Sequence, residues 1–236
     1  MRTIIHESET RGQADHGWLH SHHTFSFAGY YNPERVHFGL LRVLNDDVVA
    51  PGKGFGKHPH DNMEIVSIPL SGSLAHQDST GRSEVIKTND VQIMSAGSGI
   101  LHSEMNASSI EPVNFLQIWI FPKEKDISPR YEQKTFDPLQ RINIIQTVVS
   151  PRKEDGGVWI NQDAWFSRLT LRQFHEITYP VHLQSNGVYV FVINGEVSIA
   201  NSPLKKRDAM GITDADRFII KANKDSELLF IEVPMR

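Results

Sequence analysis

Short runs of alternating or β-branched residues dominate the chain. The clearest are MEIVSIPL (63–70), NFLQIWIF (114–121), VYVFVI (188–193) and ELLFIEV (227–233). Turn-forming sequences such as PGKG, SGS, DSTG, TNDV and INGE separate these runs, and long stretches of helical periodicity are absent. Many short strands joined by turns are typical of a β-sandwich or barrel. The pattern therefore predicts an all-β fold, with one short helix near DPLQRI.

Similar runs recur in the same order in the two parts of the chain. The aligned pairs are IVSIPLSGSLAHQ (65–77) with VYVFVINGEVSIAN (188–201), NDVQIM (89–94) with RDAMGI (207–212), and LQIWIFP (116–122) with LLFIEVP (228–234). The first pair aligns Gly72 with Gly195, and the second aligns Asp90 with Asp208. The offsets of 123, 118 and 112 residues keep their order. This repetition predicts a duplication, and hence two β-barrels of similar topology.

The segment KEKDISPRYEQKTFDP (123–138) is highly charged and contains prolines, which is typical of a linker. We therefore expect three parts along the chain. Residues 1–122 form an N-terminal barrel, residues 123–138 form the linker, and residues 139–236 form a C-terminal barrel.

Composition excludes several kinds of partner and site. The net charge of -4 gives no basic face, so we expect neither nucleic acid nor an anionic membrane as a partner. The absence of cysteine excludes disulfides and thiolate metal sites. No secretory signal and no membrane-spanning apolar run is visible. We expect a cytoplasmic protein that is a monomer or a weak homo-oligomer, and the 12 histidines direct attention to metal chemistry.

Two pairs of polar residues have the spacing that places both side chains on one face of a strand. His58 and His60 in GFGKHPHDNMEIV (54–66) are two residues apart, and Pro59 between them would face the other way, near a strand start or edge. His102 and Glu104 in AGSGILHSEMN (96–106) have the same spacing. Three imidazoles and one carboxylate from two hairpins predict a metal site with open positions for oxygen chemistry.

These motifs resemble those of the cupin superfamily. Gly52, His58-Pro-His60, Glu64 and Gly72 resemble its first motif, and AGSGILH resembles its second, with Gly97 where many cupins have proline. HPH followed by AGxGxxHSE resembles the pirin family. The runs HGWLHSHHTFSFAGYYNP and FGLLRVLNDDVVAPGKGFGKHPH resemble, more narrowly, bacterial pirin-like quercetin 2,3-dioxygenases. The resemblance implies a bicupin fold, two jelly-roll β-barrels in tandem, with metal bound only in the N-terminal barrel.

The carboxylate ligand is ambiguous from strand geometry alone, because Glu64 lies four residues after His60. The resemblance implies Glu104, and Glu64 would then either support the ligands or lie on the strand surface. The expected ligands of one divalent metal cation are thus His58, His60, His102 and Glu104. Iron is the first expectation, with nickel, copper, cobalt, manganese or zinc as alternatives.

The internal repeat indicates that the second barrel has lost its ligands. The offset of 123 residues carries His58 and His60 to Val181 and Leu183. The offset of 118 residues carries His102 and Glu104 to Ile220 and Ala222. His182 is one residue out of register, so on a regular strand it would face the wrong way.

The remaining histidines and aromatic residues have simpler interpretations. We expect His20 and His22 to pack near the barrel mouth, and His76 and His175 to lie in solvent or turns. Phe25, Phe27 and Tyr30 either line a pocket for a flat aromatic ligand or belong to the core.

The resemblance implies an oxidoreductase of the quercetin 2,3-dioxygenase type. It would cleave a flavonol polyphenol with O2 and release carbon monoxide, and Glu104 would act catalytically by accepting the proton of the 3-hydroxyl. Two alternatives stay open because fold does not determine function. One is a non-enzymatic, metal-dependent regulator that binds a partner protein. The other is an isomerase or another cupin enzyme that acts on a different small molecule with the same ligands.

Overall fold

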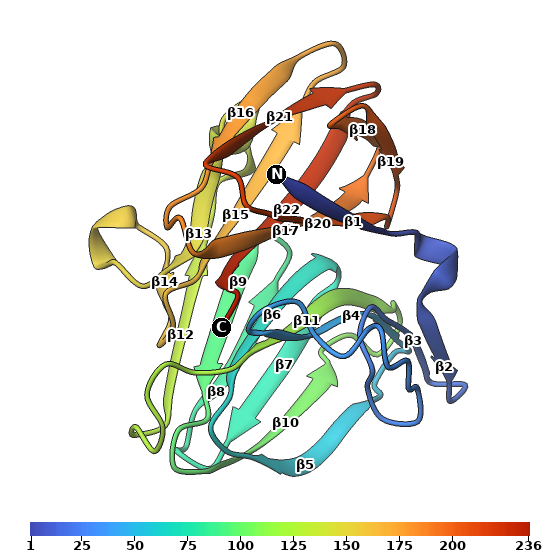
Figure 1. Cartoon of the computed structure of the whole chain (residues 1–236). Coiled ribbons are helices and arrows are strands. Elements are labelled where there is room, and N and C mark those ends of the chain that lie inside the picture. Colours follow the sequence, from blue (N-terminus) through green and yellow to red (C-terminus); the bar gives the residue numbers. More distant parts are fainter.

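The protein is an all-β molecule in a computed structural model that describes residues 1–236. Four sheets lie one above another (Figure 1). The helices are three short 3-10 turns, η1 (Ser8–Thr10), η2 (Pro138–Arg141) and η3 (Lys153–Asp155). The helix expected near DPLQRI is η2, which begins where the Asp137 carboxylate accepts a hydrogen bond from the backbone N–H of Leu139 at 2.9 Å. No helix has the length and hydropathy that crossing a membrane requires.

The first barrel, in the lower half of Figure 1, consists of a seven-stranded and a four-stranded sheet. The larger sheet has the order β12-β9-β6-β11-β4-β3-β2, and the smaller has the order β5-β10-β7-β8. The strands of the larger sheet are β2 (Gly12–Asp15), β3 (Leu19–His23), β4 (Leu41–Val49), β6 (Glu64–Ser71), β9 (Asp90–Ser95), β11 (Val113–Ile120) and β12 (Arg130–Thr135). Those of the smaller are β5 (Gly54–His60), β7 (Ser73–Asp78), β8 (Ser83–Lys87) and β10 (Ile100–Asn106).

The second barrel, in the upper half of Figure 1, has the same construction. Its larger sheet has the order β1-β20-β17-β22-β15-β13-β14, and its smaller sheet has the order β16-β21-β18-β19. The strands of the larger sheet are β1 (Arg2–His6), β13 (Gln146–Ser150), β14 (Val158–Trp159), β15 (Trp165–Leu171), β17 (Asn186–Asn194), β20 (Ala209–Thr213) and β22 (Ser226–Pro234). Those of the smaller are β16 (Glu176–Pro180), β18 (Glu196–Ile199), β19 (Ser202–Lys205) and β21 (Arg217–Ala222).

The two barrels repeat one topology, so the expected duplication and bicupin architecture are confirmed. The order β9-β6-β11-β4 recurs as β20-β17-β22-β15, and β5-β10-β7-β8 recurs as β16-β21-β18-β19. Gly72 and Gly195 occupy equivalent turns in the two barrels, with φ of +74° and +90°, a conformation that favours glycine. Asp90 and Asp208 are also equivalent, because each carboxylate accepts a hydrogen bond from the backbone N–H three residues earlier, at 2.8 and 2.9 Å.

Two edge strands come from outside the sequence repeats. β1 pairs with β20 of the second barrel, with Arg2 opposite Thr213, although it precedes the first barrel in the chain. β12 lies within the expected linker and pairs along the whole of β9. The division into residues 1–122, 123–138 and 139–236 therefore remains a proposal. In the structure, β1 from the first of these segments completes a sheet of the second barrel, and β12 from the expected linker completes a sheet of the first barrel.

The main hydrophobic core lies between the barrels, where the two seven-stranded sheets face each other. It contains 25 buried residues, including Val66 and Leu116 from one sheet and Phe191 and Leu229 from the other. The interior of the second barrel is filled by a separate cluster of 16 apolar side chains. In the first barrel, by contrast, several inward positions carry polar side chains around a cavity, and these form the candidate site.

Candidate metal centre

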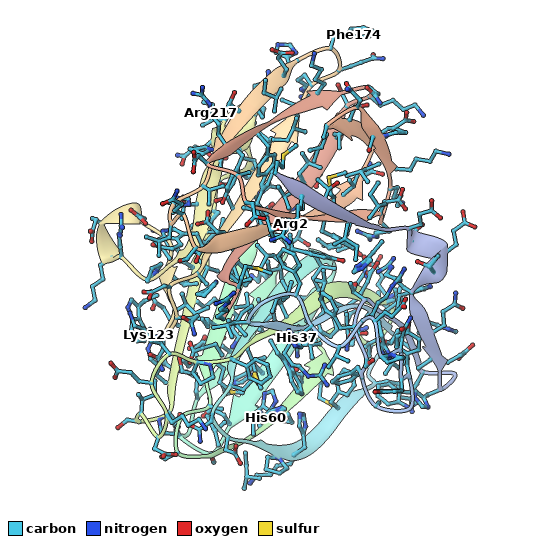
Figure 2. All side chains as sticks on the ribbon, in the orientation of Figure 1. Arg2, His37, His60, Lys123, Phe174 and Arg217 are labelled. Atoms are coloured by element: carbon cyan, nitrogen blue, oxygen red, sulfur yellow. The ribbon has the colours of Figure 1, made fainter.

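Neighbouring strands β5 and β10 bring the three predicted histidines together. His58 lies opposite His102, and Ile100 lies opposite His60. β5 forms the edge of its sheet, so Pro59, whose side chain faces outward, leaves no central hydrogen bond unmade. An irregularity in the pairing between His102 and Glu104 gives β5 one extra residue, a kind of bulge that is frequent beside functional sites. Figure 2 shows His60 in the first barrel, far from Phe174 and Arg217 in the second.

The three imidazoles converge on one point. Their ring centroids are 4.8 Å apart for His58 and His60, 4.5 Å for His58 and His102, and 4.9 Å for His60 and His102. The Nε2 atoms of His58 and His102 lie 3.0 Å apart. The Nδ1 atom of His58 lies 2.8 Å from the carbonyl oxygen of Gly56 and can donate a hydrogen bond to it, which leaves the Nε2 lone pair free to bind a cation.

Burial keeps two of these rings, those of His60 and His102, in the neutral form that binds metal. Burial, together with the neighbouring His58, lowers the pKa of His60 to about 4. Burial also lowers the pKa of His102 to about 3, again with contributions from the adjacent histidines. A metal requires a neutral imidazole, so these two rings are ready to bind at neutral pH without first releasing a proton. The donor set and its protonation thus fit a divalent cation.

Glu104 is buried inside the barrel on the same face of β10 as His102. Gln117 donates a hydrogen bond from Nε2 to Glu104 Oε2 at 2.6 Å, and Ser67 Oγ lies 3.0 Å from Glu104 Oε1. Ser67 Oγ also lies 2.8 Å from Gln117 Oε1. One hydroxyl hydrogen can serve only one of these two oxygens. All the hydrogen bonds are made only when Glu104 carries a proton that it donates to Ser67.

The tendency of Glu104 to hold a proton also follows from its burial. Burial raises the pKa of this carboxyl to about 7, although the hydrogen bonds from Ser67 and Gln117 act in the opposite direction. A cation beside the carboxylate would favour its ionised form. Glu104 can therefore change protonation state near neutral pH in response to what binds next to it.

The structure groups the ligand-type residues into two overlapping sets. His58, His60 and His102 form one, and His76, His102 and Glu104 form the other; within each set the candidate ligand atoms lie within 4.8 Å of one another. His102 is common to both sets. The four residues expected from the sequence are therefore neighbours, and the assignment of all four to one metal remains a proposal.

His76 is not a solvent or turn residue, as the sequence suggested, but is fully buried on β7 opposite Glu104. Its Nε2 lies 2.9 Å from the Asp78 carboxylate, and its ring centroid is 5.4 Å from that of His102. Burial lowers the pKa of His76, whereas the hydrogen bond with Asp78 raises it. A signal was present in the sequence, because His76 and Asp78 have the same two-residue spacing as the predicted ligands. By contrast, His175 is exposed in a turn, as expected.

Glu64 lies outside the site. Residues 61–63 form a turn between β5 and β6, so the strand alternation that starts at His60 does not continue to Glu64. The Glu64 carboxylate instead accepts hydrogen bonds from Ser95 Oγ at 2.8 Å and from the backbone N–H of Asn161 at 3.1 Å. It ties the first barrel to a loop of the second.

Strand pairing shows that the second-barrel positions equivalent to the predicted ligands lie two residues before those expected from the repeat offsets. Phe218 pairs with Tyr179 as His102 pairs with His58, and Ile220 pairs with Ile199 as Glu104 pairs with His76. The counterparts of the first-barrel residues are therefore Tyr179, Phe218 and Ile220, all buried in the apolar interior. His182 lies elsewhere, stacked on Trp165 with ring centroids 4.7 Å apart. The only polar group among these three side chains is the Tyr179 hydroxyl, which donates a hydrogen bond to Glu232 Oε2 at 3.1 Å and whose pKa is raised by burial.

Gly97 explains one departure from the cupin pattern. Its φ of +49° is outside the range that proline can adopt, and a Cβ at this position would lie 2.0 Å from the carbonyl oxygen of Ile127. The turn before β10 therefore requires glycine where many cupins have proline.

A cavity of about 270 Å³, which we call the inner cavity, adjoins the candidate ligands. Its lining includes three of the candidate ligands and a hydrogen-bond partner of one of them, namely His58, His60, Glu104 and Gln117. The other lining residues are Phe27, Asn45, Asp47, Phe55 and Trp119. Of the aromatic residues considered from the sequence, Phe27 thus lines the cavity, whereas Phe25 belongs to the core between the barrels. His20 is exposed beside Asp15, and His22 is half-buried.

Comparison with known proteins gives matches along the whole chain. Residues 5–120 match the family model described as Pirin, and residues 147–233 match that of the quercetinase C-terminal cupin domain. Quercetin 2,3-dioxygenase of Escherichia coli (strain K12) is 43% identical over 230 residues, which cover 98% of each chain. The crystal structure of a bacterial pirin from Escherichia coli in complex with nickel(II) has a TM-score of 0.93 and 41% identity over 99% of each chain. A quercetin 2,3-dioxygenase structure from Acinetobacter baumannii, at 18% identity and a TM-score of 0.77, shares the fold; the match covers 98% of this chain and 79% of that one.

Proposed function

The chain belongs to the pirin family of the cupin superfamily, and from this membership we propose that it is a metal-dependent dioxygenase acting on a flavonol such as quercetin. The observation that carries the proposal is the convergence of three imidazoles beside a buried carboxylate at an aromatic-lined cavity. The relative from Escherichia coli that is named quercetin 2,3-dioxygenase supports this choice of substrate class. The expected co-substrate is O2, and the expected product is carbon monoxide together with the opened heterocycle.

We infer that His58, His60, His102 and Glu104 would hold one divalent metal. Three imidazoles and a carboxylate suit iron, which is our first expectation, and also nickel, the metal in the similar pirin structure. When bound, the metal would act as a Lewis acid that favours the ionised form of a substrate hydroxyl. Phe27, Phe55 and Trp119 would pack against a flat aromatic substrate and exclude water from it.

Glu104 would act as the proton acceptor for the substrate hydroxyl. Ser67 and Gln117 hold its carboxylate in one position, so it needs no reorientation to receive a proton. Once protonated, Glu104 would donate to Ser67, and Ser67 would donate to Gln117 Oε1, which completes the ring of hydrogen bonds. The chain thus provides a place to hold the proton during the reaction.

Oxygen consumption by the metal-loaded protein, measured against a panel of polyphenols with carbon monoxide as the followed product, tests the proposal. We expect consumption with flavonols that carry a free 3-hydroxyl and none with flavonols that lack it. Metal-dependent binding of a partner protein, with no oxygen consumption for any polyphenol, would instead support the regulatory alternative.

We expect one metal per chain. The second barrel has Tyr179, Phe218 and Ile220 at the equivalent positions. Phenylalanine and isoleucine have no ligand atom, and the buried Tyr179 hydroxyl keeps its proton and donates a hydrogen bond to Glu232. Elemental analysis of reconstituted protein should give a ratio near one. A reproducible ratio near two would show that the second barrel also binds metal.

Replacement of His76 by alanine is expected to weaken metal binding. His76 packs beside His102 and is itself held by Asp78, so its loss frees the His102 ring to move. Loss of a group that orients a ligand typically costs about 10- to 100-fold in metal affinity. Competition with a chelator, monitored on nickel(II), measures the dissociation constant. His175→Ala, an exposed histidine in a turn, is the matched control, and equal affinities for the two variants would contradict this role.

A further inference from the structure

Asp47 is a buried carboxylate without a cationic partner. On β4 it faces the inside of the first barrel, whereas its neighbour Asp46 faces the opposite side and pairs with Arg207 at 3.0 Å. Asp47 is 3% exposed, and Ser21 donates a hydrogen bond to its Oδ1. No protein group donates to Oδ2. Because burial of an unpaired carboxylate is costly, this arrangement suggests a role for Asp47 other than stability.

Asp47 stands where two cavities meet. A second cavity of about 520 Å³, which we call the outer cavity, reaches Gln13 and His16 at the surface. It shares four lining residues with the inner cavity, namely Phe27, Asn45, Asp47 and Phe55. The inner cavity alone is small for a three-ring flavonol, so such a ligand would extend into the outer cavity and pass between these four residues.

The charged group at this junction, the Asp47 carboxylate, is a hydrogen-bond acceptor. Its Oδ1 accepts from Ser21, whereas its Oδ2 has no donor from the protein, and the neighbouring Asn45 amide can both donate and accept. Phe27 and Phe55 provide apolar lining at the same junction. This chemistry fits a flat aromatic ring that carries a free hydroxyl, because the hydroxyl can donate to the Asp47 carboxylate, which cannot itself donate when it is ionised.

We propose that Asp47 is a specificity-determining residue that accepts a hydrogen bond from a substrate hydroxyl remote from the 3-hydroxyl. The inference rests on the proposed function and adds to it the requirement for a second free hydroxyl. A site built to receive a hydroxyl rejects an analogue that lacks it, because the buried acceptor is left unpaired. For a charged acceptor the expected preference is roughly 10- to 100-fold in kcat/KM.

The test compares three flavonols on the metal-loaded protein. They are quercetin, a flavonol without hydroxyls on the pendant phenyl ring, and a flavonol without hydroxyls on the fused benzene ring. We expect the parent protein to disfavour one of the two analogues by roughly 10- to 100-fold. Burial raises the pKa of Asp47 to about 7, so assays at pH 8 keep it ionised.

Asp47→Leu removes the acceptor and keeps a similar shape. In this variant, kcat/KM for quercetin is expected to fall to the value for the disfavoured analogue, so the preference is lost. The variant should turn over the disfavoured analogue with nearly the same kcat/KM as the parent protein. Asp47→Asn retains one acceptor oxygen and should restore part of the preference. An equal loss on all three flavonols would indicate a structural role, and no change at all would show that the ring hydroxyl lies elsewhere; either result overturns the proposal.

Ser79→Ala tests whether the flavonol instead reaches the candidate metal centre through a different surface groove. Ser79 lines a groove that shares only His60 and Trp119 with the inner cavity. We expect it to leave the preference unchanged, and a preference that depends on Ser79 rather than Asp47 would overturn the proposal.

Anaerobic binding of the same flavonols, followed by their absorbance, separates this inference from the proposed function. Binding with an Asp47-dependent preference, but without oxygen consumption, would support recognition by Asp47 and contradict the dioxygenase. Absence of binding for every flavonol would overturn both.

Discussion

Replacement of His102 by alanine is expected to remove the metal and abolish flavonol cleavage while the chain stays folded. His102 belongs to both groups of ligand-type residues, and its ring centroid lies within 5.4 Å of those of His58, His60 and His76. The main core lies between the barrels and does not include these residues. Metal content and oxygen consumption should fall to background, and His58→Ala should behave in the same way.

Thermal unfolding of the same variants separates a functional site from a structural one. A cooperative transition is expected for the metal-free variants, because the apolar strands hold the barrels together. His175→Ala should retain both metal and transition. Loss of the cooperative transition in His102→Ala and His58→Ala would mean that the site is structural, and it would weaken the case for an enzyme.

Replacement of Glu104 by glutamine is expected to preserve the metal and abolish most turnover. The amide can accept from Gln117 and donate to Ser67, so it reproduces the hydrogen bonds of a protonated Glu104. It cannot take up a proton at neutral pH. Loss of a positioned base typically costs about 10²–10⁴ in rate.

The measurement for Glu104→Gln is metal content together with carbon monoxide release from a flavonol. Full metal with activity within a few-fold of the parent would show that Glu104 is not the base. The next residue to change would then be Asp47, the other carboxylate at the inner cavity. Glu64 would not be a candidate, because it faces Ser95 and the loop at Asn161.

Local features of the candidate site could be predicted because they depend on strand alternation. Residues two apart on a strand share a face, so the amino-acid sequence alone places His58 with His60 and His102 with Glu104. The contact between the two pairs was inferred from their donor types and then from the family resemblance, since alternation does not reveal which strands are neighbours. Strand pairing then supplied the missing relation, with His58 opposite His102.

The errors arose where the chain turns or where loops differ in length. Three residues of turn were enough to move Glu64 to another sheet, although its spacing from His60 matched a continuous strand. The equivalence of His102 was wrong by two residues because the loops before β10 and β21 differ between the repeats. His76 was missed because a single histidine beside a serine-rich turn has no spacing signal unless Asp78 is read with it.

The pairing of β1 with β20 has a consequence for how the chain folds during synthesis. Residues 2–6 leave the ribosome roughly 200 residues before their partner strand at 209–213. At translation rates of about 5–20 residues per second, β1 waits for about 10–40 s. The strands of the first barrel are synthesised during that time, whereas β1 stays unpaired until β20 has been synthesised. Ile4 and Ile5 are exposed on this unpaired strand throughout the interval. Pairing of β1 with β20 is therefore expected to be the last step of folding and the step at which two nascent chains can most easily associate through their strand edges.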